Sequence, residues 1–196
     1  YLQLCAENNM IVANLTSPAQ YFHILRRQIY QPFRIPLILF TPKGMLRHAL
    51  AVSTLEEFTQ GKFYHIIDDN KFANALIKPR KILLCSGKIY YELATEINKK
   101  KINDIALIRI EQYYPFNNHL FEEIISKYKN DTLYWVQEEP KNMGAWLYLR
   151  EYMNPSLEKL NKKLEYIGRP NAAATATGLY IIHQREQQQI IDAALS

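Results

Sequence analysis

Short apolar runs alternate with segments of helical periodicity along most of this chain. The apolar runs predict strands at residues 10–15, 36–40, 81–86, 104–110, 132–137 and 164–167. Between them, apolar residues recur every three or four positions and predict helices at residues 18–30, 88–99, from about 120, 146–155 and 183–195. Strands that alternate with helices form parallel sheets through right-handed crossovers. We therefore predict an α/β fold with a doubly wound, mostly parallel sheet.

Two helix starts carry capping signals. Ser17 is placed to cap the first helix, Pro18 suits the first helical position, and Gln20 completes a capping box. Ser53 and Glu56 have the same spacing and predict a second, shorter helix. Each signal fixes where a connection ends and a helix begins.

The first helix is amphipathic. Phe22, Leu25 and Ile29 fall on one face, and His23 and Arg27 share the other. We expect the apolar face to be the one that packs against the protein.

The predicted elements divide the chain into three parts. Residues 1–50 form strand–helix–strand, residues 51–80 form a connector, and residues 81–196 form a complete second domain. Within the connector, residues 66–79 are polar and irregular, which is typical of a surface segment. One strand–helix–strand unit is half of a parallel α/β unit. Because the chain also begins with Tyr rather than Met, we expect it to be a fragment of a longer protein.

Composition excludes several classes of protein. Of the 196 residues, 48% are hydrophobic and 22% are charged, which is typical of a folded soluble domain. No apolar run approaches the roughly 20 residues that span a bilayer, so no membrane partner is predicted. The net charge is +5, but basic and acidic residues are interleaved, which disfavours nucleic acid as a partner. Cys5 and Cys85 lie in buried-looking contexts and indicate free thiols in a reducing compartment.

The segment 136–146 reads VQEEPKNMGAW and lies where ligand sites and interfaces form in open α/β sheets, at the carboxyl end of a strand. Glu138 and Glu139 are candidates for an acid/base pair. Adjacent residues on a strand point in opposite directions, however, which favours solvated side chains or salt bridges at a subunit interface. Gly144 beside Trp146 suggests close backbone approach and an aromatic anchor, either for packing or for the same interface.

Four basic residues form a candidate anion site if the first helix and the second strand end at the same edge. They are Arg26, Arg27, Lys43 and Arg47. Such a cluster suits an anionic effector or a phosphate. The alternative is a set of salt bridges to a neighbouring domain.

The remaining motifs favour structural roles. No two of the five histidines have metal-ligand spacing, and no HExxH or CxxC pattern occurs, so no metal site is predicted. His48 is interpreted as a hydrogen-bonded structural residue rather than part of a polar network at a domain seam. Ser86, Gly87 and Lys88 follow a strand but lack the rest of a phosphate-loop motif.

Six phrases carry a resemblance that runs along the whole chain. They are LTSPAQYFHILRRQ (15–28), PKGMLRHALAVSTLEEF (42–58), LCSGKIYYEL (84–93), RIEQYYPF (109–116), QEEPKNMGAW (137–146) and YIGRP (166–170). The chain resembles the C-terminal part of the 2-oxoglutarate dehydrogenase decarboxylating component. More distantly, its second half is similar to the C-terminal domain of transketolases and of pyruvate dehydrogenase beta subunits.

The resemblance implies a fold, a reaction and partners. Residues 1–50 would end a pyrimidine-binding domain, and residues 81–196 would form a transketolase-like C-terminal domain. The full enzyme would decarboxylate 2-oxoglutarate on thiamine diphosphate with Mg²⁺ and succinylate the lipoyl group of its acyltransferase. It would be a homodimer in a complex with dihydrolipoyl succinyltransferase and dihydrolipoyl dehydrogenase. The resemblance fits the cytoplasm of a bacterium or the mitochondrial matrix.

The resemblance carries no catalytic, cofactor-binding or metal residue to this chain. The family's diphosphate-and-magnesium motif begins Gly-Asp-Gly, which does not occur here, and its catalytic histidines and glutamate lie upstream of the matching region. We therefore expect the fragment alone to be inactive and to support dimerisation and domain packing. Some family members bind acetyl-CoA between the last two domains, and the basic cluster is the candidate for such a site.

Two alternatives remain open at this point. One is the related 2-oxoadipate dehydrogenase component. The other is a non-catalytic dimerisation or regulatory module. The departures from the family pattern at Thr41, Gly44 and Ala49 are conservative and do not separate these alternatives.

Overall fold

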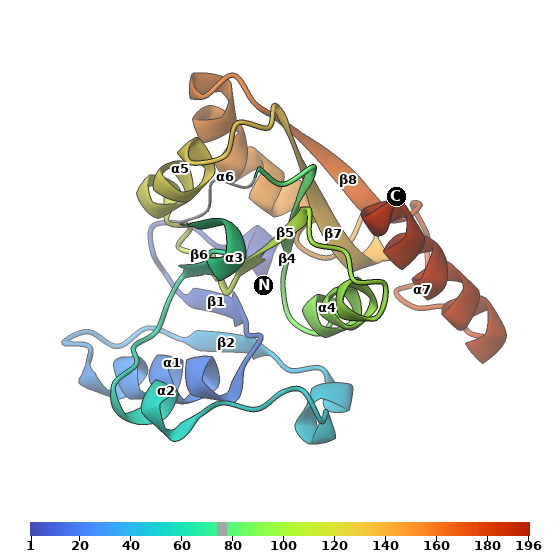
Figure 1. Ribbon diagram of the computed structural model, residues 1–196. Helices are drawn as coiled ribbons and strands as arrows, with labels where there is room; N and C mark the ends of the chain where they lie inside the picture. Colours follow the sequence, from blue (N-terminus) through green and yellow to red (C-terminus); the bar gives the residue numbers. More distant parts are fainter. Residues whose placement is uncertain (74–77) are drawn as a thin grey trace.

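The computed structural model describes residues 1–73 and 78–196, which contain a five-stranded and a three-stranded β-sheet (Figure 1). The larger sheet has the order β3-β5-β4-β7-β8. Its strands are β3 (Ile66–Ile67), β4 (Lys81–Cys85), β5 (Ile105–Ile110), β7 (Thr132–Pro140) and β8 (Lys163–Arg169). All are parallel except β3, which pairs antiparallel with β5 at one edge. This confirms the mostly parallel sheet.

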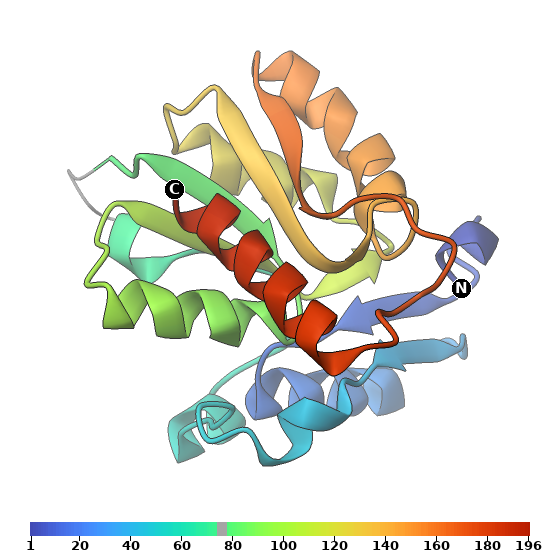
Figure 2. The same cartoon turned by 90° about the vertical axis from the view of Figure 1, so that its right-hand side faces the viewer.

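Helices cover both faces of the larger sheet, so the fold is doubly wound (Figure 2). On one face lie α4 (Ile89–Lys99) and α7 (Tyr180–Leu195), which pack on each other. On the other lie α5 (Asn118–Ser126) and α6 (Trp146–Lys159). Among the described residues, no helix is both long and apolar enough to cross a membrane.

The smaller sheet has the order β2-β1-β6 and contains strands from both of the predicted domains. Its strands β1 (Ile11–Asn14) and β2 (Leu37–Phe40) are parallel and are connected through α1 (Pro18–Tyr30). The third strand, β6 (Gln112–Tyr114), follows β5 directly and pairs antiparallel with β1. A segment of the expected second domain thus completes the sheet of the first. The domain boundaries at residues 50 and 80 stay a prediction.

Short helices fill the connections. They are η1 (Leu2–Leu4), η2 (Lys43–Arg47), α2 (Leu55–Thr59) and α3 (Asn70–Ala73). The segment 66–79, predicted to be irregular, contains β3 and α3, while residues 74–77 lie outside the described part of the chain. Polar character therefore did not exclude regular structure here.

The start of α1 is as predicted, but its capping box does not close. Ser17 Oγ accepts a hydrogen bond from the backbone N–H of Gln20 over 3.3 Å. The Gln20 side chain turns away from the cap, donates to Tyr64 O over 2.7 Å and accepts from Tyr64 N over 3.2 Å. Gln20 therefore holds the connector against the helix instead of closing the box.

Two further boundaries differ from the predictions. The second capping box is formed by Thr54 and Glu57, one residue later than expected, because Ser53 Oγ accepts from Ala19 N over 3.2 Å instead. In α6, Pro155 lies inside the helix rather than at its end. Buried residues on both sides of Pro155, Met153 and Leu157, keep the helix packed across it.

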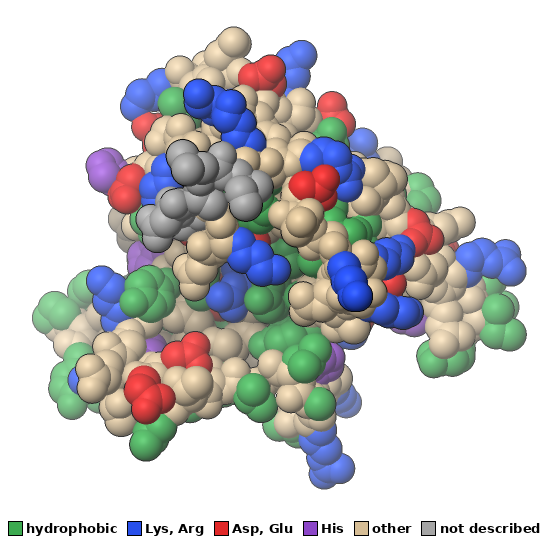
Figure 3. Space-filling view, in the orientation of Figure 1, with side chains coloured by type: hydrophobic (Ala, Val, Ile, Leu, Met, Phe, Trp, Pro, Cys, Tyr) green, Lys and Arg blue, Asp and Glu red, His purple; other side chains and the backbone are tan. Residues whose placement is uncertain are grey.

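The faces of α1 are the reverse of the prediction. His23 and Ile24 are 3% and 0% exposed, whereas Phe22, Leu25 and Ile29 are 45%, 42% and 72% exposed. In Figure 3 apolar side chains lie exposed at the lower left edge, near the end of α1. The inward polar side chains have partners, since the His23 Nε2 atom bonds Glu57 O over 2.7 Å. Satisfied hydrogen bonds therefore offset the cost of burying this polar face.

Candidate functional site

The structure does not bring the four basic residues together. Since α1 runs antiparallel to β1 and β2, its second half lies near the starts of these strands, whereas η2 follows the end of β2 (Figure 1). Accordingly, Arg27 lines one pocket, beside Ile11 at the start of β1, and Lys43 lines another. Arg26 and Arg47 are exposed. The assumption that helix and strand end at the same edge was wrong, and the four residues do not share one pocket.

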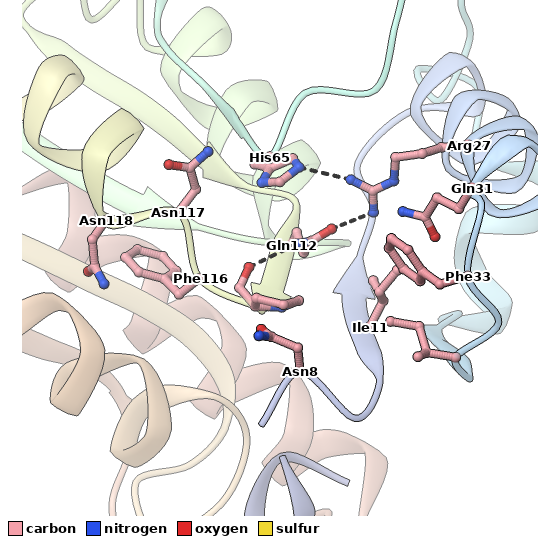
Figure 4. Close-up of a pocket in the computed structure, with 12 residues that line it drawn as sticks. Asn8, Ile11, Arg27, Gln31, Phe33, His65, Gln112, Phe116, Asn117 and Asn118 are labelled. Atoms are coloured by element: carbon pink, nitrogen blue, oxygen red, sulfur yellow. Dashed lines mark hydrogen bonds between the residues drawn. The ribbon is translucent and has the colours of Figure 1, made fainter. Parts of the chain in front are cut away.

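The Arg27 pocket has a volume of about 730 Å³ and lies between α1, β6 and the start of α5 (Figure 4). Its wall combines amide, basic and aromatic side chains. They include Asn8, Arg27, Gln31, Phe33, His65, Gln112, Phe116, Asn117 and Asn118. Asn117 caps α5 by accepting from Leu120 N over 3.0 Å.

Arg27 is held by two neutral acceptors. Its Nη1 atom donates to His65 Nε2 over 2.8 Å, and its Nη2 atom donates to Gln112 Oε1 over 2.5 Å. Gln112 in turn donates to Pro115 O over 2.8 Å. The guanidinium carbon also lies 4.3 Å from the centre of the Phe63 ring, within the range of a cation–π interaction. The orientation of Arg27 is therefore fixed.

The hydrogen bonds define the tautomer of His65. A guanidinium has only donors, so His65 Nε2 accepts and Nδ1 carries the proton. Burial, together with the charge of Arg27, lowers the pKa of His65 to about 4. His65 is therefore neutral at physiological pH and adds a donor, not a charge, to the pocket.

The pocket combines an uncompensated cation with unused hydrogen-bonding atoms. Within the described ranges, no carboxylate lies within salt-bridge distance of Arg27. Arg27 Nε, His65 Nδ1 and the acceptor Gln31 Oε1 are buried without a partner. Two free donors around a positive charge suit a carboxylate or a phosphate.

His65 and Gln112 were missed in the sequence. Gln112 is 3% exposed and lies in the otherwise apolar, aromatic phrase 109–116, so a buried polar role was indicated by its context. His65 lies in the connector outside any motif, and no local signal marks it.

Glu138 and Glu139 face different sides of the end of β7, as alternation along a strand requires. Glu138 Oε1 lies 2.5 Å from Lys88 Nζ, which is also 2.5 Å from Glu92. Gln187 of α7 donates to the same Glu138 oxygen over 3.1 Å. Glu138 therefore ties α4 and α7 to the sheet, while Glu139 is exposed. Whether either residue lies at a subunit interface stays a prediction.

Trp146 belongs to the core and not to the surface. It is 4% exposed, and its ring centre lies 5.3 Å from that of Tyr166. Gln137 accepts from the Trp146 backbone N–H over 3.0 Å and from Trp135 Nε1 over 2.8 Å. Of the two roles considered for Trp146, its burial favours packing, and a role at a subunit interface stays a prediction.

The other sequence candidates have structural roles. Ser86 Oγ lies 2.8 Å from Asn14 O and 2.7 Å from Ile110 O and can donate its one proton to either carbonyl, which joins the two sheets. His48 Nδ1 accepts from Leu50 N over 3.3 Å, as a structural histidine would. In residues 1–73 and 78–196, no three His, Cys, Asp or Glu side chains gather as metal ligands.

Comparison with known proteins identifies the family. A family model described as 2-oxoglutarate dehydrogenase C-terminal matches residues 52–195. The 2-oxoglutarate dehydrogenase E1 components of Brucella abortus (strain S19) and Brucella ovis are 44% and 45% identical over 207 aligned positions. These alignments cover 100% of this chain and 21% of each relative, so the chain spans about a fifth of their length. The chain belongs to the 2-oxoglutarate dehydrogenase C-terminal family.

Proposed function

We propose that this chain is the C-terminal part of an E1 component that decarboxylates 2-oxoglutarate on thiamine diphosphate with Mg²⁺. The succinyl group would then pass to the lipoyl group of an acyltransferase. The observation that carries the proposal is the similarity to proteins named 2-oxoglutarate dehydrogenase E1 component over the whole chain, at 44% identity.

The proposal includes an assembly. The E1 component would be a homodimer and would work with dihydrolipoyl succinyltransferase and dihydrolipoyl dehydrogenase. The term E1 component in the names of the relatives supports a multienzyme complex. We propose the bacterial cytoplasm as its location, with the mitochondrial matrix as the alternative, and the bacterial source of both relatives supports the first.

The test compares two 2-oxo acids on the full-length protein. We expect thiamine diphosphate-dependent turnover of 2-oxoglutarate with a higher kcat/KM than that of 2-oxoadipate. A preference for 2-oxoadipate would instead assign the protein to the related 2-oxoadipate dehydrogenase component. Absence of turnover with either acid, in a protein that still dimerises, would favour a non-catalytic dimerisation or regulatory module.

This segment would support dimerisation and the packing of the catalytic domains. Its described residues do not fit the cofactor, because they offer no gathered metal ligands and the sequence has no Gly-Asp-Gly motif. We therefore expect that the isolated chain neither binds thiamine diphosphate nor decarboxylates 2-oxoglutarate. Calorimetric titration with thiamine diphosphate and Mg²⁺ tests this, and micromolar binding would contradict it.

A second proposal concerns the Arg27 pocket as a site for an anionic effector. The uncompensated charge of Arg27 and the two free donors, Arg27 Nε and His65 Nδ1, support it. Acetyl-CoA, which the family resemblance suggests, combines phosphates with a ring that could contact the aromatic wall at Phe33 and Phe116.

Neighbouring arginines provide a matched test of the effector site. We expect Arg27→Gln to weaken acetyl-CoA binding by about tenfold or more, since a charge-assisted hydrogen bond is lost. Arg26→Gln removes the same charge from the exposed neighbouring position and should change affinity by less than about threefold. Calorimetric titration measures both. Equal losses in the two variants would indicate nonspecific electrostatic attraction rather than a site.

A further inference from the structure

Four chain segments lie together at one edge of the larger sheet. Each leads from the preceding helix or connector into a parallel strand: residues 78–81 into β4, 99–105 into β5, 126–132 into β7 and 159–163 into β8. Because these four strands are parallel, their amino ends lie at the same edge, along the upper left margin of Figure 2. We call the four segments together the basic edge.

Hydrogen bonds join neighbouring segments of the basic edge in the order of the strands. Arg80 N donates to Asp104 O over 2.6 Å, which ties the β4 segment to the β5 segment. Asn130 Nδ2 donates to Pro79 O over 2.9 Å, and Lys162 Nζ donates to Asn130 O over 2.7 Å. The basic edge is therefore one continuous surface and not four separate loops.

Folding concentrates positive charge at the basic edge. Its segments contain eleven of the chain's 24 lysines and arginines but only two of its 19 aspartates and glutamates. Their formal charge is therefore +9, whereas the rest of the chain carries −4 in a protein of net charge +5. Basic and acidic residues are interleaved along the sequence, but the fold separates them in space.

Carboxylates neutralise only part of this charge. Arg80 pairs with Asp104 at 3.1 Å, and four of the lysines pair with carboxylates on the adjoining helices and connector. Lys101, Lys129 and Lys163 are exposed, and no carboxylate of the described residues lies within salt-bridge distance of them. These three lysines are available to a partner.

The composition of the basic edge favours carboxylates over phosphates as its partner groups. Ten of its eleven cations are lysines, whereas the planar fork of arginine suits phosphate and nucleic-acid recognition. Proteins that bind single strands also stack bases on aromatic rings, but no exposed large hydrophobic side chain lies in these segments, all of whose residues the structure describes. The same absence disfavours a membrane surface, since interfacial binding buries apolar side chains.

The position of the basic edge favours a separate protein as the partner. The smaller sheet meets the larger one at the opposite, carboxyl ends of the strands, where Ser86 Oγ lies 2.8 Å from Asn14 O. The basic edge therefore points away from residues 1–50. We infer that it is a docking surface for a carboxylate-rich face of another protein. The inference does not rest on the proposed function, because the charge distribution alone carries it.

An acidic peptide is the probe that tests the inference. A fluorescein-labelled peptide of ten glutamates is titrated with the full-length protein that contains this chain, and binding is followed by fluorescence anisotropy. We expect saturable binding that weakens as the salt concentration rises from about 50 to about 200 mM, because salt screens exposed charges.

Two variants that each lose three exposed lysines locate the binding surface. The edge variant combines Lys101→Gln, Lys129→Gln and Lys163→Gln. The control variant combines Lys43→Gln, Lys62→Gln and Lys141→Gln, at exposed positions outside the basic edge that form no salt bridge among the described residues. We expect the edge variant to bind the peptide at least about tenfold more weakly and the control variant to change affinity by less than about threefold.

Several results would overturn the inference. The full-length protein could fail to bind the peptide, or the two variants could lose affinity equally. A ten-residue thymidine oligonucleotide and vesicles containing phosphatidylserine test the other partner classes. If either binds more tightly than the peptide and loses this binding in the edge variant, the partner is a nucleic acid or a membrane instead. Unfolding midpoints are compared with the wild type first, and Lys129→Gln with Lys163→Gln serves if the edge variant unfolds.

Discussion

Arg27 Nη1 donates a hydrogen bond to His65 Nε2 over 2.8 Å, which places a permanent cation against a ring that must remain neutral. A second proton on the ring would remove the acceptor and set two positive charges side by side. Burial and Arg27 accordingly lower the pKa of His65 from 6.5 to about 4. The contact between α1 and the connector is therefore sensitive to acid.

This contact predicts a pH dependence of folding. Because the folded-state pKa of His65 is lower than the unfolded-state value, the unfolded chain takes up the proton first as pH falls. The stabilisation is fully present above about pH 6.5 and is lost progressively toward pH 4, by roughly 3 kcal/mol at most. Urea denaturation across this range measures it. His65→Gln keeps an acceptor for Arg27 without titrating, so the pH slope of the variant should be smaller.

Comparing wild type with His65→Gln cancels the contributions of other titrating groups to the pH dependence of the unfolding free energy. Identical pH slopes in wild type and His65→Gln would contradict the prediction. So would an NMR titration of the His65 ring with a midpoint near pH 6.5.

The reversed faces of α1 give a second prediction. Ile24 is fully buried, and Ile29, on the same helix, is 72% exposed. In the chain of residues 1–196, Ile24→Ala should cost about 2–4 kcal/mol of unfolding free energy through the cavity it leaves. Ile29→Ala should cost less than about 0.5 kcal/mol. Chemical denaturation checks both. Similar losses would show that the apolar face of α1 is covered, as the periodicity first suggested.

The contrast shows how far the sequence could predict this fold. The buried strands of the larger sheet were predicted because each is a continuous apolar run between chain-breaking residues. Amphipathic periodicity located α1 correctly but not its inward face. His23 and Gln20 could be recognised as buried only from their partners Glu57 and Tyr64, which lie more than 30 residues away.

The shortest strands and the candidate site also depend on partners that are distant in the sequence, so they could not be predicted from local patterns. β3 and β6 contain two and three residues, too few for a periodic pattern, and exist because β5 and β1 pair with them. Arg27 was a candidate from charge alone. Its pocket depends on His65 and Gln112, which long-range folding places beside it.

Gly144 provides a third prediction. It has φ +66°, a backbone conformation that residues with a side chain rarely adopt. A Cβ atom there would lie 2.8 Å from the side-chain nitrogen Nε2 of Gln137. Gly144→Ala should therefore destabilise the chain by about 1–3 kcal/mol, through backbone strain and displacement of Gln137. Gly178→Ala is the matched control, since a Cβ atom there meets nothing within 4 Å. If both variants unfold at the same denaturant concentration, the turn does not constrain Gly144.

The last prediction concerns Glu111, which is fully buried where β5 leads into β6. Its carboxylate accepts hydrogen bonds from the Thr16 backbone N–H over 2.8 Å and from the Thr16 hydroxyl. Arg109 Nη1 also donates to Thr16 Oγ1 over 2.9 Å. Glu111 thus fixes the segment that enters α1, while its neighbour Gln112 holds Arg27 near the other end of that helix.

Two substitutions at Glu111 separate hydrogen bonding from charge. Glu111→Leu leaves the Thr16 N–H without an acceptor and Arg109 without a nearby anion, so we expect a loss of about 2–4 kcal/mol in unfolding free energy. Burial raises the pKa of the Glu111 carboxyl, so the charged form gains little from its surroundings. Glu111→Gln keeps an acceptor and should therefore cost only about 1 kcal/mol. Denaturation at pH 7 measures both, and equal losses would mean that charge rather than hydrogen bonding holds this junction.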